Sequence, residues 1–250
     1  MNDIREAKRR IRERIWRLLE ERNVASFPRP VYGRIPNFKG AERAAEHLFS
    51  TPEWREARVV KVNPDAPQRP VRLRALREGK ILVMATPRMR EGFLLLDPRL
   101  IPPRYYREAS TIRGAFRWGR RLTLDELSKL HIDLIVAGSV AVDRSGGRLG
   151  KGEGYAELEY AILRELGVVD DDTPVATTVH DLQVVDRVPR DEYDLTVDII
   201  ATPTRLYRVN PRPPKPRGIL WDRLPEEKLR EIPILRELRK RLEGYAEEGA

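Results

Sequence analysis

The 250-residue sequence has no cysteine, and this absence excludes several kinds of site at once. A chain without thiols can form no disulfide, no thiolate metal site and no cysteine nucleophile. Histidine is scarce as well, with three widely separated residues, His47, His131 and His180. A zinc site needs several such ligands together, so we do not expect one. His180 follows an expected strand, where it could serve a site, but a lone loop histidine is more often structural.

Long apolar runs are also missing. Residues 1–21 carry charges at nearly every turn and lack the apolar centre of a signal peptide. No later run reaches the length that a membrane-spanning helix needs. We therefore expect a cytoplasmic protein with no membrane partner, while the sequence leaves the oligomeric state open.

Charges of both signs are plentiful, and the balance is basic. The 48 Lys and Arg residues outnumber the 39 Asp and Glu residues, for a net charge of +9. Such an excess favours anionic partners, which include nucleotide phosphates, a polyglutamylated substrate and RNA. Basic residues gather at 69–74 and 212–217. Because aromatic side chains are not interleaved with these runs, an ordinary solvated surface is the simpler interpretation, and RNA binding is the alternative.

Apolar periodicity predicts several helices. Residues 3–22 have apolar side chains at three- and four-residue spacing, and residues 40–49 form a second helix that ends before Pro52. Thr123 and Glu126 form a capping box for a short helix to about residue 130. Further helices are expected over residues 156–166, ended by Gly167, and over residues 225–242, interrupted by Pro233.

Short apolar runs between these helices predict buried strands at 57–62, 80–85, 132–142, 173–179 and 197–201. Strands that alternate with helices indicate an α/β fold with a mostly parallel sheet and helices on both faces. Ligands bind such sheets at the carboxyl ends of the strands. Residues 203–216 are rich in proline and arginine, which indicates an extended linker or a surface strap. We therefore expect one α/β domain over residues 1–205 and a linker with a C-terminal helix over residues 206–250.

One stretch has the composition of a ligand site, residues 133–155, where a buried strand leads into a glycine-dense loop and then a helix. Glycines let backbone amides approach an anion, and a helix start adds free N–H groups and partial positive charge. Arg148 and Lys151 add full charges. The spacing of Gly150, Gly152 and Gly154 matches neither the P-loop nor the Rossmann fingerprint. We interpret the loop as a phosphate-binding cradle, with a tight strand-to-helix turn as the structural alternative.

This stretch resembles the nucleotide loop of the 5-formyltetrahydrofolate cyclo-ligase (methenyltetrahydrofolate synthetase) family, whose pattern includes R-L-G-x-G-x-G-Y-Y-D. Residues 133–157 carry the match, and residues 188–200 meet a second family pattern, V-P-x-x-x-x-D-x-x-V-D-x-I. Weaker support comes from the first helix, where K-x-x-L-R is met by Lys8, Ile11 and Arg12. The resemblance spans about residues 3–205. Residues 32–40 have no counterpart in ordinary cyclo-ligases, which suggests a divergent subgroup of methenyltetrahydrofolate-synthetase-domain proteins.

The resemblance implies a NagB/RpiA/CoA-transferase-like α/β fold and the conversion of 5-formyltetrahydrofolate to 5,10-methenyltetrahydrofolate with ATP and Mg2+. In that reaction the formyl oxygen attacks the γ-phosphate, and N10 then closes on the formyl carbon as phosphate leaves. Such phosphoryl transfer needs charge neutralisation and alignment more than acid–base chemistry. The alternative is a non-catalytic or repurposed nucleotide-binding member of the same fold that binds RNA or a ribonucleoprotein.

The same resemblance assigns roles to individual residues. Arg148 and Lys151 are the expected catalytic residues, and Asp65 and Arg88 the expected contacts to the folate. Glu157 and Asp194 are the expected magnesium ligands, with Tyr155-Ala156-Glu157 in place of Y-Y-D, so that the carboxylate stands one methylene further out. The expected ATP-binding residues are Lys8, Arg12, Arg148, Leu149, Gly150, Lys151, Gly152, Glu153, Gly154 and Tyr155.

Overall fold

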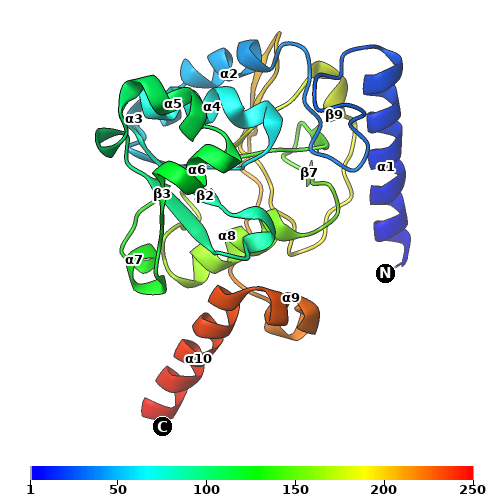
Figure 1. Cartoon of the computed structure of the whole chain (residues 1–250). Coiled ribbons are helices and arrows are strands. Elements are labelled where there is room, and N and C mark those ends of the chain that lie inside the picture. The colour runs from blue at the N-terminus through cyan, green and yellow to red at the C-terminus, as the bar shows by residue number, and fades with distance from the viewer. Residues whose placement is uncertain (1, 250) are drawn as a thin grey trace.

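The computed structural model describes residues 2–249 and is built on one large sheet (Figure 1). Its eight strands have the order β11-β10-β8-β5-β1-β2-β3-β4. The five strands β10, β8, β5, β1 and β2 are parallel to their neighbours in this group, and antiparallel strands close both edges. The strands are β1 (Val59–Val62), β2 (Ile81–Ala85), β3 (Phe93–Leu96), β4 (Arg120–Arg121), β5 (Leu134–Ala137), β8 (Val175–Thr178), β10 (Ile199–Ala201) and β11 (Leu206–Arg208).

Helices cover both faces of the sheet, as the sequence predicts for a parallel sheet. One face packs against α2 (Ala41–Phe49), α3 (Pro52–Glu56), α4 (Arg69–Arg77), α5 (Tyr106–Ala109) and α6 (Ile112–Trp118). The other packs against α7 (Leu124–Ser128), α8 (Tyr155–Glu165) and α10 (Pro233–Glu248). Short 3-10 turns connect these elements at Ala66–Gln68, Pro87–Met89 (η2), Pro98–Leu100, Pro103–Tyr105, Asp181–Gln183 and Trp221–Arg223.

Successive side chains of each strand point to opposite faces of the sheet, so both faces carry apolar side chains. In β1, Val60 and Val62 point toward α4, while Lys61 between them points toward α8. The same alternation in β2 sends Leu82 and Met84 one way and Val83 and Ala85 the other. The sheet is therefore buried on both sides, and a charged side chain such as Lys61 needs a partner within the core.

A second, three-stranded sheet has the order β7-β6-β9 and supports the N-terminal helix. Its strands are β6 (Ala141–Asp143), β7 (Arg148–Leu149) and β9 (Val184–Val185), and α1 (Asn2–Glu21) packs on it. Ile15, Trp16 and Leu19 of α1 share a core cluster with Val140 and Leu149. Figure 1 shows α1 beside β7 and β9, at one side of the main body.

The prediction of a single strand over residues 132–142 is wrong. The chain ends β5 at Ala137, passes through Gly138 and Ser139, and begins β6 in the second sheet at Ala141. An apolar run does not show that its two halves belong to different sheets. The sequence patterns did not predict β3, β4, α4, α5 or α6. In α4, the many arginines obscured the apolar face formed by Val71, Ala75 and Leu76.

The C-terminal region returns to the body of the protein. β11 adds an antiparallel strand beside β10, so residues 206–208 of the proline-rich segment form an edge strand of the main sheet in place of the expected linker or strap. Helix α9 (Glu226–Glu231) precedes α10, and Pro233 separates the two as expected. Ile234, Leu235 and Leu238 of α10 are buried in the same cluster as α7 and α8, while the far end of α10 extends from the body (Figure 1). None of the helices in residues 2–249 is long and apolar enough to cross a membrane. A domain boundary at residue 205 stays our proposal.

Candidate functional site

The glycine-rich loop lies at the carboxyl end of the parallel strands, where it connects β7 to α8. Gly152 and Gly154 have φ angles of 103° and 76°, in the left-handed region that disfavours other residues. Gly154 is the N-cap of α8, and no side chain caps this helix start. The first amides of an eleven-residue helix are therefore free for a ligand, as an anion site requires.

Arg148 lies beneath this loop and is almost fully buried. Its Nε and Nη2 donate to the carbonyl oxygen of Gly138 at 2.9 and 2.6 Å, and Nη1 donates to Oε1 of Glu157 at 3.0 Å. The guanidinium group also lies against Gly150, where an added Cβ would stand 3.4 Å from Nη2. Arg148 thus joins the end of β5 to the first turn of α8, and its charge is shared with Glu157.

Of the other expected loop residues, one is buried and anchors the loop, and two are exposed. Leu149 is buried in the cluster beneath α1, and its carbonyl oxygen accepts the N–H of Val140 at 2.7 Å. Lys151 and Glu153 are exposed and form an ion pair of 3.4 Å. Lys151 is therefore the cation that the loop itself presents to solvent.

Arg12 and Lys8 lie on one face of α1, as their spacing predicts, and both reach the loop region. Arg12 Nε donates to the carbonyl oxygen of Gly150 at 2.7 Å, and its guanidinium lies beside Gly152, where a Cβ would stand 3.3 Å from Cζ. Burial lowers the pKa of Arg12, against the raising influence of Glu157 and Asp194. The N-terminal helix thus supplies a partly buried cation to the glycine loop.

Lys8 forms a buried ion pair with Asp194. The distance from Lys8 Nζ to Oδ2 of Asp194 is 2.6 Å, and the same oxygen accepts the N–H of Asp191 at 2.7 Å. Burial raises the pKa of Asp194, the two donors lower it, and the nearby Glu157 raises it further. The two expected metal ligands therefore share one electrostatic environment.

Glu157 and Asp194 fit the way magnesium binds with a nucleotide. Among the residues described, no three His, Cys, Asp or Glu side chains gather into a metal site. Magnesium commonly uses only one or two carboxylates and completes its shell with phosphate oxygens and water. Each carboxylate gives one oxygen to a cation, Oε1 of Glu157 to Arg148 and Oδ2 of Asp194 to Lys8. The second oxygen of each is the one that would meet a metal.

Asp65 lies in the loop after β1 and faces the end of β5. An added Cβ on Gly138 would stand 2.9 Å from Oδ2 of Asp65 and 2.7 Å from Oε1 of Gln68. Burial raises the pKa of Asp65, while Lys151, Arg72 and Arg148 lower it. Gln68 donates to Thr178, but its Oε1 is buried without a hydrogen-bond partner in residues 2–249. Two oxygen acceptors thus lie side by side at this end of the sheet.

Arg88 follows β2 and lies near the start of α8. Contact with Tyr155 raises its pKa, and the charge of Glu231 contributes further. Its φ angle of 54° is left-handed, a conformation that costs a non-glycine residue about 1–2 kcal/mol. Strain of this kind gathers at ligand sites more than elsewhere.

Sequence reasoning missed a buried ion pair between Lys61 of β1 and Glu159 of α8. Both side chains are at least nine-tenths buried, and Lys61 Nζ also donates to Oδ1 of Asn63 at 3.0 Å. Burial raises the pKa of Glu159, and Lys61 opposes this. A lysine inside a strand expected to be buried on both faces was the available signal. His180, by contrast, is structural, since its Nδ1 accepts the N–H of Leu182 in a capping arrangement.

Several residues of the two basic stretches make contacts within the fold. Arg72 is buried, donates to the carbonyl oxygens of Asn63, Asp65 and Ser110, and has its pKa lowered by burial to about 10. Lys215 and Arg212 both donate to Oδ1 of Asp198, at 2.9 and 3.2 Å. These contacts give no support to the RNA-binding alternative.

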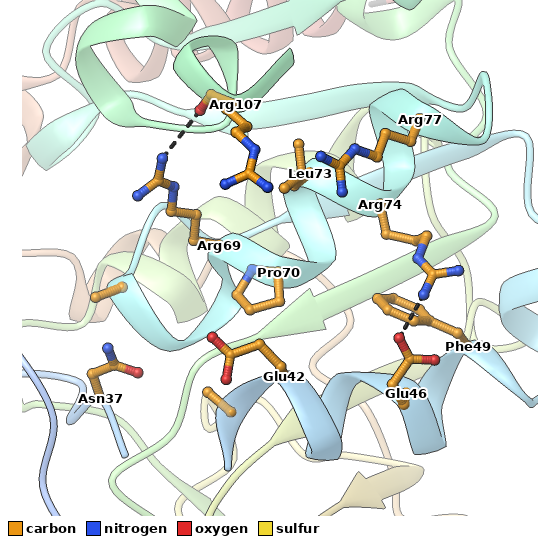
Figure 2. A pocket seen from close by; sticks show the side chains of 12 residues that line it. Asn37, Glu42, Glu46, Phe49, Arg69, Pro70, Leu73, Arg74, Arg77 and Arg107 are labelled. Carbon is orange, nitrogen blue, oxygen red and sulfur yellow. Dashed lines mark hydrogen bonds and ion pairs between the residues drawn. The ribbon is translucent and has the colours of Figure 1, made fainter. Parts of the chain in front are cut away.

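A separate groove of about 500 Å³ lies between α2 and α4, away from the glycine loop. Figure 2 shows Arg74 hydrogen-bonded to Glu46 on one side and Arg69 to the backbone of Arg107 on the other. Its two carboxylates, Glu42 and Glu46, lie on the α2 side and its guanidinium groups lie on the opposite side, so the groove is not a uniformly cationic surface.

Comparisons with known proteins show which family the sequence resembles. The 5-formyltetrahydrofolate cyclo-ligase family profile matches residues 4–203. The chain is 48% identical over 241 residues to the methenyltetrahydrofolate synthase domain-containing protein of Bos taurus, and 44% identical over 243 residues to that of Homo sapiens. These alignments cover 93% and 94% of this chain but 62% of each relative, so the chain spans less than two thirds of either.

The solved structures give the same result for the fold. The structure of 5,10-methenyltetrahydrofolate synthetase from Aquifex aeolicus superposes with a TM-score of 0.50 at 22% identity, over 82% of this chain and 92% of that one. At this level of identity the likeness concerns the fold alone. It confirms the α/β architecture with a mostly parallel sheet. The family profile, which matches residues 4–203, shows that this chain belongs to the 5-formyltetrahydrofolate cyclo-ligase family.

Proposed function

We propose that the protein converts 5-formyltetrahydrofolate to 5,10-methenyltetrahydrofolate with ATP and Mg2+, in the cytoplasm. One observation carries the proposal: the free N-terminus of α8, the glycine loop and the cations of α1 meet at a single place, beside Glu157 and Asp194. Three separate parts of the sequence build this place, and each of them is a family element. Positive charge and backbone amides together favour a polyphosphate.

The nucleotide phosphates would lie against the loop and the first turn of α8. Lys151 is exposed there, and Arg12 crosses the loop from α1. Arg148 supports this surface from below through Gly138 and Glu157, so we assign it the role of ordering the loop. Lys8 acts in the same way through Asp194.

Glu157 and Asp194 would hold the magnesium ion. The ion would supply charge neutralisation at the phosphates, as in other phosphoryl transfers. The chain's own contribution is to fix the two carboxylates, one by Arg148 and one by Lys8.

The folate would lie at the carboxyl ends of β1, β2 and β5, between Asp65 and Arg88. Asp65 and the free Oε1 of Gln68 offer neighbouring acceptors for N–H donors of a pterin ring. Arg88 stands at the start of α8, where the folate site and the nucleotide site would meet. This placement brings the formyl group toward the phosphates.

The chemistry then follows from alignment. The formyl oxygen attacks the γ-phosphorus, the bond to the bridging oxygen breaks, and ADP leaves. N10 attacks the formyl carbon and loses its proton, and inorganic phosphate leaves with the formyl oxygen. Lys151 and the loop amides neutralise charge on the transferring group, and positioning of the two substrates accounts for much of the remaining rate.

The test is formation of the methenyl chromophore from 5-formyltetrahydrofolate. We expect absorbance to rise only when ATP and Mg2+ are both present, and Lys151→Ala to slow it by about 100-fold, the scale for one electrostatic contact to the transition state. Lys240→Ala, on the exposed side of α10, is the matched control and should keep full activity. A protein that binds ATP but forms no chromophore at any concentration would overturn the proposal.

A further inference from the structure

The C-terminal segment, residues 219–238, lies beyond the family profile yet returns to the candidate site. It is anchored at both ends: the N–H of Ile219 donates to Oε1 of Glu165 in α8 at 3.0 Å, and Ile232 and Leu235 are fully buried in the main core. Helix α9 lies between these anchors. Its position relative to α8 is therefore set by the fold.

Lys228 of α9 lies over the ring of Tyr155, with 3.4 Å between Nζ and the ring centroid. Tyr155 is the first residue of α8, directly after the N-cap Gly154. Lys228 is half-buried, and no carboxylate in residues 2–249 forms an ion pair with it. A partly buried ammonium group with only an aromatic partner is held weakly compared with one that faces an anion.

Most cations of the candidate site are already paired with carboxylates. Arg148 is paired with Glu157, Lys8 with Asp194, and Lys151 lies 3.4 Å from Glu153. Each of these cations is balanced by a carboxylate before any ligand binds. Arg12 at the glycine loop likewise forms no ion pair with a carboxylate in residues 2–249. A nucleoside triphosphate brings several negative charges, so a further cation without a carboxylate partner beside the α8 N-terminus strengthens its binding.

The same segment contacts the other loop of the site. Arg223 donates to Oδ1 of Asp191 at 3.1 Å and to Oε1 of Glu192 at 2.8 Å, and lies 4.8 Å from the ring centroid of Tyr193. Asp194, the partner of Lys8, lies in the same loop. The segment thus contacts both the start of α8 and the loop that holds Asp194, so these contacts fix it beside the site.

We propose that Lys228 is a further phosphate-binding residue, whose ammonium group leaves the ring of Tyr155 to pair with a phosphate oxygen of the bound nucleotide. The proposal rests on the proposed nucleotide site and extends it to a part of the chain that the family profile does not cover. Tyr155 holds the ammonium close to the helix start until the anion arrives.

The test is calorimetric binding of Mg-ATP and of adenosine to the full chain. Lys228→Met keeps the alkyl stem and removes the charge; it should weaken ATP binding about tenfold, or about 1.4 kcal/mol. Adenosine, which has no phosphate, should bind as it does to the wild type. Lys228→Arg should retain most of the ATP affinity, and Lys240→Met on exposed α10 is the control for general loss of charge. Lys228→Gln replaces Lys228→Met if the latter does not fold.

The outcomes separate the two claims. Equal ATP affinity in Lys228→Met and wild type, with wild type binding well, overturns the role of Lys228 and leaves the nucleotide site intact. Equal weakening of ATP and adenosine shows that Lys228 only supports the packing of α9, and also overturns it. A wild-type protein that binds no ATP overturns the nucleotide site and this inference together.

Discussion

Lys8 and Asp194 lie 186 residues apart in the sequence and form a buried ion pair, with 2.6 Å between Nζ and Oδ2. The pair joins the N-terminal helix to the loop before β10, and both ends belong to family elements. Because α1 rests on the small sheet and the loop adjoins the large one, the pair also links the two sheets. It defines one wall of the candidate site.

Removal of one partner should therefore be costly. Lys8→Met leaves the Asp194 carboxylate buried without its cation, and we expect a loss of about 3 kcal/mol in the free energy of unfolding, measured by urea denaturation. The double variant Lys8→Met with Asp194→Asn should regain part of this loss, because no charge is left unpaired. Arg9→Met, which breaks only exposed ion pairs with Glu6 and Glu13, should change little. If Lys8→Met were as stable as Arg9→Met, the pair would not be a structural link.

The Lys61–Glu159 pair should appear in the dependence of stability on pH. Burial raises the pKa of Glu159 in the folded state. Its contribution to the free energy of unfolding is therefore fully present below the unfolded-state pKa of about 4.5, and it declines as pH rises through the folded-state pKa. Lys61→Met removes the charge that holds this pKa down, and we expect its stability deficit relative to wild type to grow between pH 5 and pH 8.

Urea denaturation at both pH values measures this difference. The double variant Lys61→Met with Glu159→Gln is the control, since it has no carboxyl group to titrate at this position. Its deficit relative to wild type should change much less over the same range. A deficit in Lys61→Met that stays constant from pH 5 to pH 8 would argue against a buried carboxylate that depends on Lys61.

The glycine loop offers a matched pair of substitutions. Gly152 has a left-handed φ of 103°, and its added Cβ would stand 3.3 Å from Cζ of Arg12. Gly33 is also left-handed, with a φ of 75°, but has nothing within 4 Å and lies outside the loop. Alanine at either position should cost about 1 kcal/mol or somewhat more in stability, measured by thermal unfolding. Only Gly152→Ala should also weaken ATP binding, because it displaces Arg12 and the loop amides. Equal ATP affinity in the two variants would show that the loop does not contact the nucleotide.

The sequence predicted the parts of the fold that local patterns determine. The capping box at Thr123 and the left-handed Gly167 both mark helix ends as expected, since the chemistry that ends a helix involves only nearby residues. The five parallel strands were all identified from short apolar runs. The single strand predicted through Gly138 was wrong, because the chain passes there from the large sheet to the small one. The sheet to which a strand belongs depends on distant residues.

The candidate site was predicted less completely, for a related reason. Residue type and family likeness indicated Lys8, Arg12 and Asp194, and the structure brings these together. They did not predict that Arg148 would point inward and donate to the carbonyl oxygen of Gly138. The direction of a side chain depends on which hydrogen-bonding groups of its neighbours lack a partner. Lys228 was missed because nothing in a charged C-terminal helix shows which earlier residue it approaches.

In the proposed reaction, the formyl oxygen accepts the γ-phosphoryl group at this site. The most direct measurement supplies 5-formyltetrahydrofolate labelled with oxygen-18 in the formyl group, with Mg-ATP, and follows the label by phosphorus NMR of the inorganic phosphate released. We expect one labelled oxygen in each phosphate, in step with the methenyl chromophore. Phosphate released without label, or chromophore formed without phosphate, would show that the formyl oxygen does not accept the phosphoryl group.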